Sequence, residues 1–406
     1  MGLLDIRTRD DDVLRFVRDR GAAFAKTPRF SSFYERLTER EARHVMALFL
    51  AARAVDGGAP ERATREIEDA LCDVGDVDGG AWTVPFRTFA EALLGRAANI
   101  AGGGNLYLDA RPPGAQLRAF ELLRLRTPLI PFGYAAGNRA LTEVFGDADE
   151  VTILDVGIGY GGQLRALLRN PAARQRLGSL HVIGVEPDTS SSGHEGALET
   201  AARSVLSAGE QVGVKTTFAG IAKRAEDLTL EDIEGARPRG LLLCNCALAL
   251  HHTLGEGSAL DGRDGVLRLL KAAGAAAIVL VEPDSDHFRD DLVERFLYAY
   301  RHYGTLWRSL QASLAPADAD LVWREFFAPE VHNVICYEGR SRTERHEEAR
   351  RWADRLKVAG WRVETLRGTV PQAAAPDGFV VSGSGPAVSL SYDGVSLLSV
   401  LRARNG

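Results

Sequence analysis

Apolar and polar positions follow a helical period through about residue 126 of this chain. Apolar side chains recur three and four positions apart there, which is the spacing of one helix face, and no strand-like alternation is convincing. Ser32 and Glu35 have the form of a capping box, and further helices are predicted at 61–72, 85–99 and 112–126. The pattern therefore predicts a helical N-terminal region.

Short apolar runs separated by helix-length segments replace this pattern after Pro128 and Pro131. Each proline removes a backbone donor and restricts the residue before it, so the pair ends the helical region. A helix is predicted near 133–146, and strands are predicted at 151–156, 181–185, 214–219, 240–246 and 275–281. This alternation is typical of an α/β fold with a mostly parallel sheet. We predict a helical cap over 1–130 and an α/β domain over 131–406.

The chain after the fifth predicted strand has a different pattern. Residues 288–314 read as one long amphipathic helix rich in aromatic side chains, which predicts a helical insertion at about 288–328. Asp393 and Gly394 stand between two alternating runs, a strong signal for a tight hairpin. The sheet is therefore predicted to finish with an antiparallel hairpin.

Composition narrows the class of protein. Hydrophobic residues make up 45% and charged residues 26% of the 406 positions, as in ordinary globular proteins. The net charge of -6 predicts no nucleic-acid partner, because phosphates are bound by basic surfaces. Four cysteines without a C-x-x-C pair, a charged N-terminus and the lack of a long apolar run favour a cytoplasmic protein with no membrane partner.

A glycine-rich turn follows the first predicted strand. Gly157, Gly159 and Gly161 let the backbone approach a ligand closely, and Gln163 opens the helix that follows. With Gly162 the turn also satisfies the G-x-G-x-x-G fingerprint, which taken alone is a weak signal. These residues are predicted to hold a cofactor.

Two acids at strand ends indicate which cofactor. Asp155 lies at the strand end just before the glycines, where a carboxylate attracts the ammonium group of a methionine moiety and opposes a pyrophosphate. Glu186 ends the second strand, where an acid accepts hydrogen bonds from ribose hydroxyls. The pair predicts S-adenosylmethionine, with S-adenosylhomocysteine as product. The alternatives are a helix cap for Asp155 and a solvated loop acid for Glu186.

Polar residues also follow the third and fourth predicted strands. Asp227 can accept from an adenine amino group, with Glu226 as the alternative, although an acid here is also an ordinary helix start. Asn245, His251 and His252 lie at the fourth carboxyl end, where ligands of open α/β sheets bind, and Asn245 is assigned to the cofactor. Either histidine can act as a general base near neutral pH.

No metal site is predicted. Cys244, Cys246 and the two histidines after them suggest zinc, but both cysteines lie inside a predicted strand and no further ligand pair follows.

The remaining candidates lie after the fifth strand. Glu282 and Tyr303 are grouped with the two histidines as catalytic, and His287, Trp307, Asn333 and Glu338 as substrate-binding. Ordinary core packing is the alternative for the aromatic residues. Arg340, Arg342 and Arg345 can recognise a carboxylate or phosphate, but we favour a solvated helix start held by charge pairs.

Several segments match a known family in order, among them 132–141, 151–163, Leu250-His-His-Thr-Leu254 and Tyr300-Arg-His-Tyr303. Glu344-Arg-His346-Glu and Ala359-Gly-Trp361 continue the match. On these residues the chain resembles the GRAS family, named for plant transcriptional regulators, and particularly its bacterial members. The resemblance implies a Rossmann-like class I methyltransferase sheet with an N-terminal α-helical cap, a helical insertion after strand five and a homodimer.

The chain departs from the plant members of that family. Its glycine turn with Asp155 and Glu186 is intact, whereas plant turns are often degraded. It ends in Ser399-Val-Leu-Arg402 where plant relatives carry a tryptophan, and it lacks their long N-terminal segment. These departures argue against a plant-type transcriptional role.

The function predicted from the sequence is an S-adenosylmethionine-dependent methyltransferase acting on a small molecule, or on a peptide or natural-product acceptor. The alternative is a non-catalytic GRAS-type protein that uses the same site to bind a small molecule or to regulate. A nicotinamide oxidoreductase is disfavoured by Asp155. Nothing in the sequence identifies the acceptor or the atom methylated.

Overall fold

The computed structural model describes residues 33–34, 36–74, 82–100, 113–187, 196–254, 261–366 and 378–406. Within these ranges no helix is both long and apolar enough to span a membrane. The predicted capping residues Ser32 and Glu35 lie outside the described residues. A capping box is observed at Thr38, whose side chain accepts from Glu41 N–H and whose own N–H donates to the Glu41 carboxylate.

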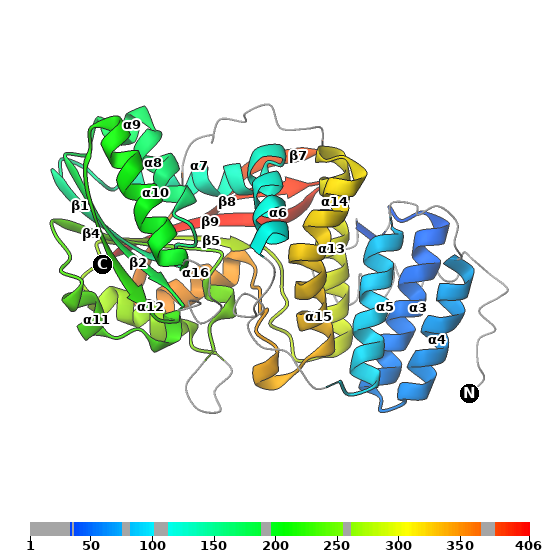
Figure 1. Cartoon of the computed structure of the whole chain (residues 1–406). Helices are drawn as coiled ribbons and strands as arrows, with labels where there is room; N and C mark the ends of the chain where they lie inside the picture. The colour runs from blue at the N-terminus through cyan, green and yellow to red at the C-terminus, as the bar shows by residue number, and fades with distance from the viewer. Residues whose placement is uncertain are drawn as a thin grey trace.

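A central sheet organises the described part of the chain (Figure 1). Its strands are β1 (Glu150–Val156), β2 (Ser179–Glu186), β3 (Lys215–Ala222), β4 (Leu241–Ala247), β5 (Ala277–Pro283), β6 (Trp361–Glu364), β7 (Phe379–Ser384), β8 (Ala387–Tyr392) and β9 (Val395–Asn405). The order is β3-β2-β1-β4-β5-β9-β8-β7, with β6 also paired to β9. Strands β1 to β5 are parallel, and the later pairings are antiparallel. The prediction of a mixed sheet, mostly parallel with an antiparallel hairpin, is confirmed.

The predicted strands and hairpin match observed elements. All five predicted apolar runs overlap β1 to β5. Asp393 and Gly394 have φ of 49° and 74°, the left-handed pair that a two-residue turn between β8 and β9 requires. Strands β6 and β7 were not predicted, because β6 has only four residues and β7 carries serine and glycine, which favour loops.

Helices cover both faces of the sheet. On one face lie α7 (Leu129–Thr142), α8 (Gly162–Arg169) and α10 (Ala197–Val212), and on the other α11 (Leu230–Gly235), α12 (Arg263–Ala272) and α16 (Ala349–Val358). The short helix α9 (Pro171–Arg174) follows α8. Because side chains alternate along a strand, Ile153 packs into one core and Leu154 into the other.

The N-terminal helices pack away from the sheet. Helices α3 (Glu39–Asp56) and α5 (Thr83–Ala97) contact the inserted helix α13 (Leu292–Ser313), and α5 also contacts α15 (Ala328–Cys336), as Figure 1 shows. Helix α4 (Pro60–Val74) packs on α3 and α5. Phe89 of α5 meets Phe296 of α13 edge-on, with 5.7 Å between ring centroids. The aromatic face of α13 thus gives α5 its apolar partner, and these helices flank the insertion rather than cap the sheet. The predicted division at about residue 130 remains a prediction.

Two further helices connect these parts. Helix α6 (Pro113–Arg126) precedes α7, and α14 (Pro316–Val322) follows α13. The helical insertion runs to Cys336, beyond the predicted end near 328. Helix α7 starts at Leu129, earlier than predicted, because its first turn tolerates Pro131.

Candidate functional site

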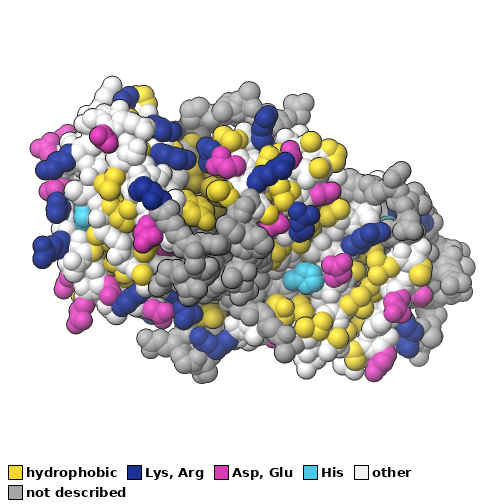
Figure 2. Space-filling view, viewed as in Figure 1, with side chains coloured by type: hydrophobic (Ala, Val, Ile, Leu, Met, Phe, Trp, Pro, Cys, Tyr) yellow, Lys and Arg dark blue, Asp and Glu magenta, His cyan; other side chains and the backbone are white. Residues whose placement is uncertain are grey.

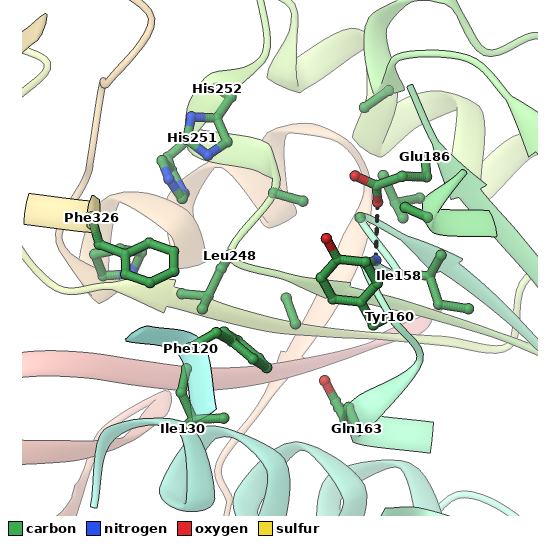
Figure 3. A pocket seen from close by; sticks show the side chains of 18 of the residues that line it. Phe120, Ile130, Ile158, Tyr160, Gln163, Glu186, Leu248, His251, His252 and Phe326 are labelled. Atoms are coloured by element: carbon green, nitrogen blue, oxygen red, sulfur yellow. Dashed lines mark hydrogen bonds between the residues drawn. The ribbon is translucent and has the colours of Figure 1, made fainter. Parts of the chain in front are cut away.

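A cavity of about 440 Å³ lies at the carboxyl ends of β1, β2 and β4. Connections from β1 and from β4 run to opposite sides there, which is where open α/β sheets bind ligands. We call it the switch-point cavity. Figure 3 shows Glu186 and Tyr160 at one end, His251 and His252 at another, and Phe120, Ile130 and Phe326 on the remaining sides. The predicted residues that line it are Asp155, Gly157, Gly159, Gln163, Glu186, His251 and His252, with the alternative Glu226.

The turn after β1 depends on its glycines. Gly157, Gly159 and Gly161 have φ of 78°, 51° and 71°, in the left-handed region that favours glycine. A Cβ on Gly157 would lie 2.5 Å from the Cβ of Ala249, so the turns after β1 and β4 meet there. Gly161 caps α8 and faces Ala201 of α10 rather than the cavity.

Asp155 lies at the cavity with only 3% of its surface exposed. It accepts a 2.7 Å hydrogen bond from Asn245 Nδ2, and Gln163 Nε2 donates to Asn245 Oδ1 at 3.0 Å. Burial raises the pKa of Asp155 to about 7, although the bond from Asn245 opposes the rise. Because Gly161 caps α8, the alternative of Asp155 as a helix cap is excluded. Asn245 lies beneath the cavity and orients the acid.

Glu186 faces the same cavity from β2. Its Oε2 accepts a 3.0 Å hydrogen bond from the N–H of Gly159 (Figure 3). Burial raises its pKa, while the bond from Gly159 lowers it. The charge of Glu186 also raises the pKa of Asp155, so the two acids interact across the cavity.

The structure separates the two acids predicted after β3. Glu226 lines the cavity, and burial raises its pKa. The side chain of Asp227 is 53% exposed and pairs with Arg224 at 3.2 Å. The preferred candidate Asp227 is therefore misplaced, because the turn of the short helix Ala225–Asp227 directs its neighbour inward.

The two histidines after β4 differ in environment. His251 is buried, with Nδ1 2.5 Å from Glu282 Oε2. Glu282 Oε1 accepts from the N–H groups of Leu250 and Ala249 at 2.9 and 3.3 Å. Burial lowers the pKa of His251 and raises that of Glu282 to about 7, so both tend toward the neutral form. Burial also lowers the pKa of His252, but the charge of Glu344 raises it above its ordinary value.

Further ionisable residues reach this end of the cavity. His302 of α13, Glu330 of α15 and His346 line it, and Glu344 lies behind them with 0% exposure. None was predicted as a site residue. The only signal was the Glu344-Arg-His346 segment quoted for the family resemblance, since these residues meet His251 only through folding.

The aromatic candidates of α13 and the end of β5 lie outside the cavity lining. His287 Nε2 is 2.9 Å from Ser285 Oγ, and its ring stacks on Tyr303 with 5.3 Å between centroids. Tyr303 reaches the cavity indirectly, by donating a 3.0 Å hydrogen bond to Glu330. Trp307 packs edge-on against Trp323, so the alternative of ordinary core packing describes this residue.

Asn333 and Glu338 lie outside the cavity lining. Asn333 binds backbone N–H groups, and Glu338 forms ion pairs. Asn333 Oδ1 accepts from the N–H groups of Thr343 and Glu344, both at 2.8 Å. Glu338 pairs with Arg96 at 2.8 Å and with Arg342 at 3.4 Å. Both residues therefore position the segment that carries Glu344.

Two of the three arginines of this segment are buried, so the favoured interpretation of a solvated helix start is wrong for them, whereas Arg340 is exposed. Arg342 and Arg345 are each 1% exposed. Arg342 Nη1 donates to the carbonyl of His287 at 2.8 Å, and Arg345 Nε donates to the carbonyl of Arg342 at 2.9 Å. Because guanidinium groups can satisfy several carbonyls at once, these arginines fix the path of the segment.

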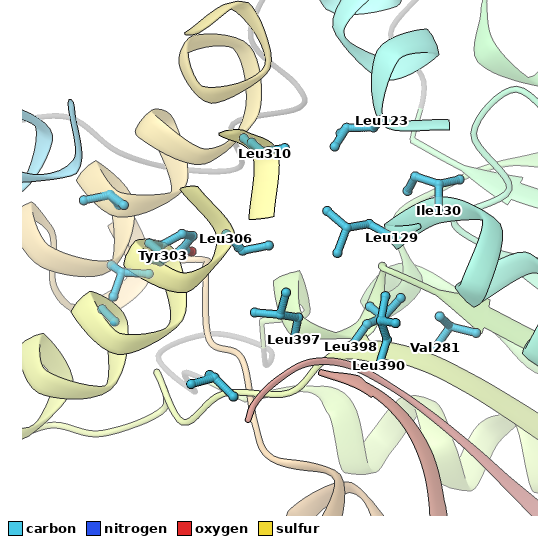
Figure 4. Packing of buried hydrophobic residues seen from close by; sticks show 14 of the residues in the cluster. Leu123, Leu129, Ile130, Val281, Tyr303, Leu306, Leu310, Leu390, Leu397 and Leu398 are labelled. Atoms are coloured by element: carbon cyan, nitrogen blue, oxygen red, sulfur yellow. The ribbon is translucent and has the colours of Figure 1, made fainter. Parts of the chain in front are cut away.

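Apolar side chains that the sequence did not single out form the cavity wall. They come from α6, α7, α13 and β9, and include Phe120, Leu129, Ile130, Leu306, Leu397 and Leu398. Figure 4 shows Leu129, Leu306, Leu397 and Leu398 gathered from these separate elements. The cavity thus combines polar ends with an apolar wall to which these four elements contribute.

The strand order, the glycine turn and the acids at β1 and β2 define a doubly wound α/β protein with a ligand cavity at its switch point. The family model for the GRAS domain family matches residues 45–375. The chain therefore belongs to the GRAS domain family.

Plant proteins are similar to this chain. Scarecrow-like protein 5 of Arabidopsis thaliana is 30% identical over 285 residues, covering 68% of this chain and 48% of that protein. Scarecrow-like transcription factor PAT1 of the same plant is 28% identical over 286 residues, covering 68% of this chain and 58% of that protein. The chain spans about half the length of the curated relatives it matches.

A solved structure shares the fold. The crystal structure of SCL7 in Oryza sativa has a TM-score of 0.74 at 22% identity, covering 89% of this chain and 99% of that one. At this identity the likeness shows the fold alone.

These comparisons correct several predictions. The prediction of a small-molecule methyltransferase is wrong, because the relatives are plant Scarecrow-like proteins, one of them named a transcription factor. The bacterial assignment and the argument against a plant-type role lose their support for the same reason. The exclusion of nucleic acid is also wrong, since transcription takes place on DNA.

Proposed function

We propose that this chain is a regulatory protein of the GRAS type that binds a small molecule in the switch-point cavity without transforming it. The observation that carries the proposal is the pair Asp155 and Glu186, two acids held at adjacent strand ends beside an intact glycine turn. A buried acid such as Asp155 costs folding free energy, so its retention favours a bound cation that offsets this cost.

S-adenosylmethionine or S-adenosylhomocysteine is the ligand we propose. Its ammonium group would lie against Asp155, whose negative charge opposes a pyrophosphate. Its ribose hydroxyls would donate to Glu186, and its adenine amino group to Glu226. The sheet would then be of the class I methyltransferase type, used here for binding.

We also propose that the chain takes part in transcription together with a partner. The name of the relative PAT1 as a transcription factor supports this. Lys and Arg side chains are interspersed with Asp and Glu on the face in Figure 2, and the net charge is -6, so a DNA-binding partner protein fits better than direct contact with phosphates. The homodimer and the cytoplasmic location remain predictions.

Calorimetric titration with S-adenosylhomocysteine tests the proposal. We expect saturable binding by the wild type at one site per chain. Asp155→Ala and Glu186→Ala should each weaken it about 10- to 100-fold, because a charged hydrogen bond contributes roughly 1.5–3 kcal/mol.

Asp227→Asn is the matched control, since this acid is exposed and outside the cavity lining, whereas Glu226→Gln should weaken binding. Wild-type protein that is folded and binds neither adenosyl compound would refute the proposed ligand. Equal losses in Asp227→Asn and Glu226→Gln would contradict the assignment of the adenine end.

A further inference from the structure

Four buried ionisable side chains converge at the histidine end of the cavity. His251 and His252 follow β4, and Glu344 and His346 lie on the segment between α15 and α16. We call them the histidine–glutamate cluster. His251, His346 and Glu344 are exposed by 3% or less, and His252 has a side-chain exposure of 13%.

The distances within the cluster suit atoms that share one ion. Glu344 Oε1 lies 3.1 Å from His252 Nδ1, and Glu344 Oε2 lies 3.4 Å from His346 Nε2 and 3.6 Å from His251 Nε2. Two ligand atoms each 2.0–2.1 Å from a tetrahedral zinc ion are about 3.3 Å apart. The ligand atoms of His251, His252 and Glu344 all lie within 4.8 Å of one another.

The buried carboxylate of Glu344 is surrounded by imidazole nitrogens at ion-pair distances. Among the described residues, no contact of these two oxygens or of the His346 ring nitrogens has the full geometry of a hydrogen bond, although the nearby imidazoles of His252 and His346 lower the pKa of Glu344. Buried polar groups in folded proteins are nearly always satisfied, and an isolated buried charge is costly. A cation held between these atoms would satisfy the carboxylate and the imidazole together.

Residues outside the cluster already orient its members. Glu282 binds Nδ1 of His251, which leaves Nε2 directed toward Glu344. A carboxylate that holds the outer nitrogen of an imidazole is the usual support of a metal-bound histidine. Asn333 accepts the N–H of Glu344 and so fixes its backbone.

We propose that the histidine–glutamate cluster binds a divalent transition ion of the Zn²⁺ type, through His251 Nε2, His252 Nδ1 and the Glu344 carboxylate. His346 Nε2, 3.4 Å from the same carboxylate, is the candidate fourth ligand. Imidazole nitrogens with one carboxylate suit Zn²⁺, whereas Mg²⁺ and Ca²⁺ prefer all-oxygen sites. Because the three histidines line the switch-point cavity, the ion faces the ligand. The proposal rests on these residues and not on the adenosyl ligand.

The test uses the full chain, without an affinity tag, stripped with a chelator and titrated with Zn²⁺ against a chromophoric competitor. We expect one Zn²⁺ per chain, and a visible absorption band of tetrahedral geometry when Co²⁺ replaces it. Glu344→Gln and His346→Gln should each weaken binding more than about 100-fold, beyond the roughly 10- to 100-fold expected for the supporting residue in Glu282→Gln.

His332→Gln is the matched control, because this histidine lies outside the cluster and is partly exposed. It should bind Zn²⁺ like the wild type. Circular dichroism checks the fold of every variant, and if Glu344→Gln does not fold, the wild-type titration and His346→Gln decide. A wild type that binds neither Zn²⁺ nor Co²⁺ would overturn the proposal, because a simple histidinium–carboxylate pair would give that result. Unchanged binding in a folded cluster variant would overturn it as well.

Discussion

Asp155 is an acid whose charge is costly in the folded protein. Burial raises its pKa from the ordinary 3.8 to about 7, so the folded state binds this proton more tightly than the unfolded state. Between about pH 4 and pH 7 the unfolded chain has already lost the proton that the folded chain retains. This group therefore makes stability fall as pH rises through that window, and the loss is complete above it.

Asp155→Asn should remove this penalty while keeping an acceptor for Asn245 Nδ2. We expect the free energy of unfolding to rise at pH 8 by about 2–4 kcal/mol, as a shift of roughly three pKa units implies, with little change at pH 4. Denaturant titrations at both pH values measure it, with the exposed Asp227→Asn as control. A variant less stable than the wild type at pH 8 would contradict the account.

Residues with a local signal could be predicted, and residues that meet through folding could not. Asp155 and Glu186 each end an apolar strand, so their place at the cavity follows from the sequence alone. Glu344 and His346 reach His251 from a distant segment with no spacing motif, and no sequence pattern indicates that contact. The sequence also could not show that the short turn after β3 directs Glu226, and not Asp227, into the cavity.

At the scale of elements, the turn after β1 fixes the approach of the turn after β4. Gly157→Ala adds a methyl group at a φ of 78° and at 2.5 Å from the Cβ of Ala249, so the two turns must separate. We expect adenosyl-ligand binding to weaken at least about tenfold and stability to fall by about 1–3 kcal/mol.

Gly213→Ala is the control that separates backbone strain from the contact with Ala249. Gly213 ends α10 at a φ of 72°, and a Cβ there would meet nothing within 4 Å. In a denaturant titration the variant should lose about as much free energy of unfolding as Gly157→Ala, while it binds the ligand like the wild type. Equal loss of binding in both variants would show that the contact with Ala249 is irrelevant.

The sequence predicted which segments form helices and strands better than it predicted which of them pack together. Strands β1 to β5 follow from apolar runs, because strands buried on both faces need them. The sequence predicted a helix at 85–99, but periodicity does not say which surface covers its apolar side chains. Aromatic side chains of α13, such as Phe296, cover α5.

In the whole molecule, one cavity combines an acidic end, an apolar wall and a histidine end from segments far apart in sequence. The sequence predicted the α/β sheet and the acidic end, but not the function. A glycine turn with two strand-end acids suits an enzyme and a ligand-binding regulator equally, so these residues could not decide between them. The similarity to plant proteins, one of them named a transcription factor, is why we propose the regulator.

A crystal structure of the chain soaked with S-adenosylhomocysteine tests the central claim most directly. The account predicts the ligand in the switch-point cavity, with its amino group at Asp155, its ribose at Glu186 and its adenine near Glu226. An adenosyl ligand bound elsewhere, or an empty cavity at a saturating ligand concentration, would contradict it.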